Sequence, residues 1–294
     1  MNSAPITIYL LLGLYHQVWD VVFERLYHYH EGYPVVVLNP GALHSEKAYH
    51  LARSYGFSYV EMVPNNIEAA QNYLIQYIID SPLVIKIDDD VFTSKNTIKN
   101  ISKIYKQAKE EGVDVGFVTP VVNVNNVTYY HFLKTLNLLD EYTRHFEKPH
   151  LARDAKRQRI WYDPIVARWI WERSLPLNDI SERFERANGN TYDLLPVRVS
   201  INCILFEKRL LIENLGFSSR GPILPGGFTV VPVRKGPLAI TDEESINFYA
   251  DVHKYGRIVA LNTIVGHLAY NPQREAMLKW FSENRNRLLE DVRR

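Results

Sequence analysis

Runs of consecutive apolar residues alternate with amphipathic stretches through the first 120 residues. Continuous apolar runs rich in β-branched residues predict strands that are buried on both faces. These runs are 6–12, 33–39, 83–87 and 113–120, and 58–63 predicts a further, weaker strand. The intervening stretches carry apolar residues at helical spacing, at about 15–29, 45–55, 67–79 and 98–108. Strands that alternate with helices predict an α/β fold with a mostly parallel sheet and helices on both faces.

The second half of the chain has a less regular pattern. Residues 121–195 mix charged residues with tryptophans and predict helices in parts and loops elsewhere. After them, 197–217 predicts a strand and a helix, 241–256 predicts a helix with an acidic head, and 257–270 predicts a strand region with a histidine. An amphipathic helix closes the chain. No internal repeat or low-complexity linker separates the halves, so we expect one domain over 1–294 with an elaborated second half.

Composition narrows the class of protein. The 294 residues are 46% hydrophobic and 23% charged, which is typical of a globular chain with a substantial core. The net charge of +1 gives no field that favours nucleic acid. A single cysteine, Cys203, excludes an intrachain disulfide and suits a reducing compartment. No apolar run reaches the ~20 residues of a membrane span, so we expect a cytoplasmic protein whose membrane contact is at most peripheral.

Candidate chemistry is concentrated in the stretch "LVIKIDDDVF" at residues 83–92, where Asp88, Asp89 and Asp90 follow an apolar strand. Ligands of parallel α/β sheets bind beyond the carboxyl ends of the strands. Three adjacent carboxylates ionise together only if a cation or hydrogen-bond donors compensate them. Mg²⁺ and Mn²⁺ prefer such oxygen ligands. The alternative is a solvated acidic turn, but the apolar strand before the aspartates favours a metal site.

Other nucleotide and metal motifs are absent from the chain. The residues after Asp90 are Val and Phe, which excludes the glycine of a calcium-binding EF-hand loop. Neither G-x-x-x-x-G-K-[ST] nor G-x-G-x-x-G occurs. The sequence therefore predicts a divalent metal site without either of the common phosphate-binding loops.

The stretch "VIKIDDDVF" resembles the D-x-D motif of GT-A glycosyltransferases, and its "DDDVF" form is especially similar to the β1,3-galactosyltransferase and Fringe group. Three further stretches resemble that family in the same order. They are "NNIEAAQN" at 65–72, "TDEESINFY" at 241–249 and "GHLAY" at 266–270. The resemblance covers roughly 1–120 and 195–270, and the stretch between them matches nothing. It implies a GT-A-like fold and sugar transfer from a nucleotide diphosphate sugar, a UDP-sugar by preference, to a glycan or glycolipid hydroxyl.

The resemblance also assigns metal-binding roles. It implies that Asp90 contacts Mn²⁺ or Mg²⁺ directly, that Asp88 reaches the metal or the ribose, and that Asp89 orients its neighbours. His267 occupies the position where many family members place a histidine on the metal. The alternative for His267 is a buried histidine of the core, because a lone strand histidine is commonly of that kind.

The acidic head of the helix at 241–256 is the candidate source of the catalytic base. Asp242 and Glu243 lie there, and we prefer Asp242 for deprotonating the acceptor hydroxyl in an inverting transfer. The alternative is that these acids only compensate the helix dipole. The alternative mechanism is a retaining transfer.

Nucleotide contacts are expected from the loops after the first two strands. The residues are Gly13, Leu14, Tyr15 and Asn39, and Asn72 is added from the helix that follows the third strand. We expect residues 1–120 to bind the nucleotide sugar and 121–294 to bind the acceptor. Trp161, Trp169 and Trp171 could stack on an acceptor sugar, but core packing is the favoured role.

Two other classes of protein are alternatives. A nucleotidyltransferase that makes sugar nucleotides shares the early part of the fold, but its first loop is normally Gly-rich with Lys or Arg, unlike "GLYHQ" at 13–17. A non-catalytic carbohydrate- or metal-binding module is the second alternative. Release of free nucleotide diphosphate from a donor would distinguish an enzyme from a module.

Overall fold

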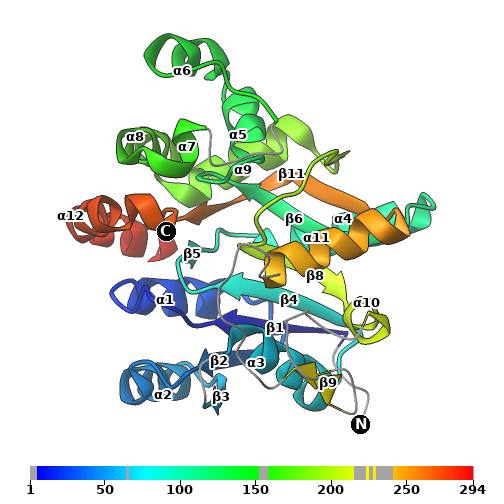
Figure 1. Ribbon diagram of the computed structural model, residues 1–294. Coiled ribbons are helices and arrows are strands. Elements are labelled where there is room, and N and C mark those ends of the chain that lie inside the picture. The colour runs from blue at the N-terminus through cyan, green and yellow to red at the C-terminus, as the bar shows by residue number, and fades with distance from the viewer. Residues whose placement is uncertain are drawn as a thin grey trace.

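A computed structural model describes residues 5–63, 66–151, 158–214, 223–224, 228–229 and 241–293. Within them one nine-stranded sheet crosses the molecule, with helices packed around it (Figure 1). Its strands run in the order β3-β2-β1-β4-β8-β6-β11-β5, and β7 pairs separately with β11. The predicted α/β class is confirmed.

The first half of the sheet is parallel throughout. It contains β1 (Ile6–Leu11), β2 (Val35–Pro40), β3 (Ser58–Met62) and β4 (Leu83–Asp88). The connecting helices are α1 (Trp19–Tyr29), α2 (Ser45–Ser54) and α3 (Ile67–Tyr73), and α3 continues as a π-helix, η1 (Leu74–Ile78). These elements agree with the predicted ones, except that α1 begins four residues later than expected.

The second half of the sheet is mixed. The strand β8 (Cys203–Glu207) lies antiparallel between β4 and β6 (Val115–Val122). The long strand β11 (Gly256–His267) runs parallel to β6 and pairs antiparallel with β5 (Val91–Phe92) and β7 (Tyr192–Leu194). Because β8 is buried between two strands, its residues show no polar alternation that would reveal its direction.

The helices of the second half gather beyond the β11 edge of the sheet (Figure 1). They are α5 (Tyr129–Thr135), α6 (Leu139–His145), α7 (Arg159–Tyr162), α8 (Pro164–Ser174) and α9 (Leu177–Asn188). Elsewhere lie α4 (Thr97–Glu110), α10 (Lys208–Glu213), α11 (Asp242–His253), the 3-10 turn η3 (Asn271–Gln273) and α12 (Arg274–Arg293). The strand β9 (Ile223–Leu224) pairs antiparallel with β10 (Phe228–Thr229) in a separate two-stranded sheet. None of the helices within the described ranges has both the length and the apolarity to cross a membrane.

A buried arginine connects α1, near the start of the chain, with α12 at its end. Arg25 on α1 has no exposed surface, and its guanidinium donates to the Thr93 carbonyl, to Asn178 on α9 and to the Leu288 carbonyl on α12. It also forms an ion pair of 2.9 Å with buried Asp291. Removing one partner of a buried pair leaves the other charge unpaired, which is costly.

We therefore expect Arg25→Met to lower the free energy of unfolding by about 3–5 kcal/mol, because Asp291 stays buried without its cation. Arg168→Met is the matched control, since Arg168 pairs with Glu172 on the surface of α8 at 60% side-chain exposure. The control should leave stability nearly unchanged, because exposed ion pairs contribute little. Urea denaturation followed by circular dichroism measures both. Equal effects of the two substitutions would show that Arg25 is not a structural anchor.

Candidate functional site

Three segments meet where the aspartates leave β4. The register pairs Leu11, at the end of β1, with Asp88, and it pairs His267, at the end of β11, with Val91 of β5. The loop after β1, the aspartate turn and the end of β11 are therefore neighbours, although they are distant in sequence. This is the carboxyl edge of the sheet, where the sequence predicts a site.

Asp89 points inward and organises the loop after β1. Its Oδ2 accepts hydrogen bonds from the Gly13 amide (2.8 Å), the Tyr15 amide (3.2 Å) and the Trp19 indole N–H (2.7 Å). Burial and the neighbouring Asp90 raise its pKa to about 7, and the donors oppose that rise. A Cβ at Gly13 would lie 3.2 Å from Asp89 Oδ1, so a larger residue would crowd the carboxylate.

Asp90 faces His267 across the β5–β11 ladder. Asp90 Oδ2 and His267 Nε2 are 3.2 Å apart, and both side chains are buried. His267 Nδ1 lies 2.6 Å from the Val124 carbonyl oxygen, which can only accept, so Nδ1 carries a proton. Burial lowers the pKa of His267, but the Asp90 carboxylate outweighs it and the net shift is upward. Nε2 and the carboxylate need a positive charge between them, which either a proton or a metal ion supplies.

A close contact between Gly266 and Trp171 fixes the end of β11 beside His267. A Cβ on Gly266 would lie 2.2 Å from Trp171 Cη2, and the Trp171 indole N–H donates to the carbonyls of His267 and Leu268. Trp171 has no exposed surface. It packs in the core, as favoured from the sequence, and supports the backbone that carries His267.

Asp88 turns toward a buried lysine. Lys86 lies two residues earlier on the same face of β4, and its ammonium bonds to Asp88 Oδ1. The same ammonium lies 3.7 Å from Asp242 Oδ2 at the head of α11. Burial raises the pKa of Asp88 to about 6, although Lys86 opposes the rise.

The head of α11 is capped by its own side chains. Thr241 and Glu244 form a capping box, so Glu244 serves the helix. Both oxygens of Asp242 are occupied, Oδ1 by the Glu243 amide (2.8 Å) and Oδ2 by Gln71 (3.0 Å). Burial and Asp242 raise the pKa of Glu243 to about 7, against a hydrogen bond with Ser200.

The remaining residues that were predicted to contact the nucleotide differ in burial and in hydrogen bonding. Asn39 is fully buried, and its amide bonds to Leu43 and to the Tyr59 hydroxyl, so the side chain holds the loop after β2. Leu14 is 55% exposed, and Asn72 is buried on α3. Tyr15 donates to the Ala269 carbonyl at 3.1 Å, which ties the first loop to the segment after His267.

Sequence reasoning missed two cations beside the first loop. The Arg274 guanidinium lies 5.0 Å from the Tyr15 ring centre and bonds to the Leu14 carbonyl. Lys47 lies 5.8 Å from the Trp19 ring centre and bonds to the His16 carbonyl. Neither forms an ion pair with any residue that the structure describes. No sequence pattern indicates Lys47 or Arg274, because they lie near the starts of α2 and α12, which are distant from the aspartates in sequence.

Two of the three predicted metal ligands face each other, whereas the third is paired with a lysine. No three His, Cys, Asp or Glu side chains in the described ranges converge as a metal-binding group. Asp88 engages Lys86, whereas Asp90 and His267 face each other at 3.2 Å. Ligand atoms at 2.0–2.2 Å from one octahedral metal are about 3 Å apart. The fixed Nδ1 proton leaves Nε2 as the ligand atom, as in many metal-binding histidines.

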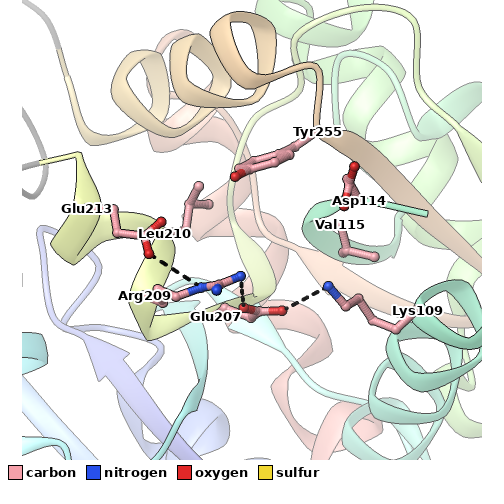
Figure 2. Close-up of a pocket in the computed structure, with 8 residues that line it drawn as sticks. All are labelled: Lys109, Asp114, Val115, Glu207, Arg209, Leu210, Glu213 and Tyr255. Atoms are coloured by element: carbon pink, nitrogen blue, oxygen red, sulfur yellow. Dashed lines mark ion pairs between the residues drawn. The ribbon is translucent and has the colours of Figure 1, made fainter. Parts of the chain in front are cut away.

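The cavity shown in Figure 2 lies at the other end of the sheet. Four of its charged residues form ion pairs, with Glu207 paired to Lys109 and to Arg209 at 3.4 Å and Arg209 paired to Glu213 at 3.7 Å. Glu207 pairs with Leu83, the first residue of β4, whereas Asp88 is the last. The cavity encloses about 40 Å³ and is too small for a sugar nucleotide.

The fold is similar to that of a solved glycosyltransferase. The mannosyltransferase PcManGT from Pyrobaculum calidifontis, in complex with GDP-Man and Mn²⁺, matches with a TM-score of 0.51 and 13% identity. The match covers 99% of this chain and 63% of that one, so this chain spans less than two thirds of its length. No protein-family model and no curated protein matches the sequence. At this identity the likeness establishes the fold alone.

Proposed function

We propose that the protein is a metal-dependent glycosyltransferase that moves a sugar from a nucleotide diphosphate sugar to a hydroxyl acceptor. The observation that carries the proposal is the buried Asp90–His267 pair at the carboxyl edge of a sheet with a glycosyltransferase fold. The "DDDVF" resemblance to the β1,3-galactosyltransferase and Fringe group supports it independently.

Asp90 and His267 would hold the metal, with Asp88 as a third ligand once it turns from Lys86. When bound, Mn²⁺ or Mg²⁺ neutralises charge on the leaving diphosphate. Asp90 comes from the first half of the chain and His267 from the second. The division into a donor half at 1–120 and an acceptor half at 121–294 therefore stays a proposal in which the metal site bridges the halves.

The donor diphosphate would lie against the first loop. Asp89 holds the Gly13–Tyr15 backbone in place, and Arg274 and Lys47 bring to the same loop two cations that have no ion-pair partner among the described residues. Cations without a carboxylate partner are suited to binding phosphate oxygens. The sequence resemblance favours a UDP-sugar, whereas the structural neighbour holds GDP-Man, so the test includes both nucleotides.

We assign the base to Glu243 rather than to Asp242, which the sequence favours. Asp242 has both oxygens occupied, so its carboxylate is suited to positioning. A general base works best with a pKa near the working pH, and the pKa of Glu243 is raised to about 7. A single base opposite the donor would give an inverting transfer.

The test is a panel of nucleotide diphosphates and their sugars, with Mn²⁺ or with EDTA. We expect one nucleotide diphosphate to stabilise the protein only with Mn²⁺, by about 2.7 kcal/mol at 100 times its Kd. Its sugar conjugate should release free nucleotide diphosphate. Thermal shift and a coupled phosphate assay measure the two effects. Failure of every nucleotide would contradict the proposal, and stabilisation without turnover would favour a non-catalytic module.

A further inference from the structure

Lys86 is a buried lysine whose ammonium donates two hydrogen bonds and forms an ion pair with a second carboxylate. Its side chain is 2% exposed, in a strand whose neighbouring residues are apolar. The ammonium contacts Asp88 Oδ1, the Ile201 carbonyl at 3.2 Å and Asp242 Oδ2 at 3.7 Å. The three oxygens belong to β4, to the segment before β8 and to the head of α11.

Asp242 also contacts a second residue of the proposed donor half, residues 1–120. Gln71 on α3 donates to Asp242 Oδ2 and accepts from the Tyr9 hydroxyl of β1 at 2.8 Å. Lys86 and Gln71 therefore hold the same carboxylate oxygen from two different elements. Buried charge networks of this kind add little stability compared with apolar packing, so stability alone is a weak reason for a lysine here.

We propose that Lys86 is a positioning residue that shares one ammonium between Asp88 and Asp242 and so fixes the head of α11 against the aspartate turn. The catalytic consequence rests on the proposed function: Glu243, next to Asp242, is held at a set place relative to Asp88. The fixed charge has a second effect. It competes with a divalent cation for Asp88, so Lys86 weakens metal binding while it positions the base.

Amide exchange tests the positioning without any ligand. In Lys86→Met, the amides of 244–247 on α11 should exchange about tenfold faster or more, because a charge-assisted contact is lost. Amides of α9 should be unchanged. Lys208→Met is the matched control, since Lys208 bonds to the Ile79 carbonyl at the opposite end of the sheet. Lys86→Arg should restore much of the protection. If Lys86→Met fails to fold, Asp242→Asn should loosen the same amides.

Titration with Mn²⁺ alone distinguishes a positioning role of Lys86 from a general loss of structure in the variant. Lys86→Met should bind Mn²⁺ at least about threefold more tightly, because a positive charge beside Asp88 is gone. General damage would weaken binding. The proposal is overturned if the 244–247 amides keep their wild-type exchange, or if Mn²⁺ affinity is unchanged or lower. If the wild type binds no Mn²⁺, the proposed function fails, and the exchange result alone decides the role of Lys86.

Discussion

Asp90→Asn is expected to remove metal-dependent donor turnover, by on the order of 10³-fold, because a metal supplies several kcal/mol of charge stabilisation in the transition state. Asparagine keeps the size of the side chain and loses the charge that both a metal and His267 require. The thermal shift produced by Mn²⁺ with a nucleotide diphosphate should disappear in the same variant. Turnover and thermal shift are measured on the same protein.

Asp80→Asn is the matched control, because Asp80 is an exposed carboxylate just before β4, at the end opposite Asp90. It should leave turnover unchanged. Full metal-dependent turnover in Asp90→Asn would show that the metal is held elsewhere. A parallel loss of turnover and of ligand-free stability would instead make Asp90 a structural partner of His267.

The order of strands and helices in the first half could be predicted, because each element follows a local pattern of apolar residues. Apolar runs such as 83–87 form strands that are buried on both faces. Each run is followed by a stretch whose apolar residues have helical spacing. The direction of β8 could not be predicted, because a strand buried between β4 and β6 has the same composition whichever way it runs. Its placement depends on contacts between distant segments, which periodicity does not record.

The meeting of candidate residues at this sheet edge could be predicted, but the contacts of each aspartate could not. Three carboxylates after an apolar strand mark a sheet edge, and the structure brings Asp90 to His267 there. The inward role of Asp89 depends on how Gly13 and Tyr15 turn after β1, which no local pattern specifies. Lys86 is the one charged residue of the run 83–87, but this does not indicate its partners. Its second partner, Asp242, is 156 positions away in sequence, so only the fold reveals it.

Glu243→Gln is expected to slow sugar transfer by about 10²–10⁴-fold, the usual cost of losing a general base. Glutamine preserves the shape of the side chain but cannot accept the proton of the acceptor hydroxyl. Affinity for the nucleotide diphosphate with Mn²⁺ should stay near that of the wild type, because the base acts on the acceptor. Asp242→Asn should cost less, since it loses an anchor to Gln71 and Lys86 and keeps the base.

The pH dependence gives the Glu243 prediction a second readout. Only the ionised carboxylate accepts a proton, and the folded protein holds the pKa of Glu243 at about 7. Transfer by the wild type should therefore rise as the pH increases through about 7, whereas the residual transfer of Glu243→Gln should lack that rise. If Asp242→Asn is the more damaging change and abolishes the rise, the base is Asp242, and its contacts with Gln71 and Lys86 must open in the reacting complex. If both variants transfer sugar at the wild-type rate, the head of α11 only caps the helix and the base lies elsewhere.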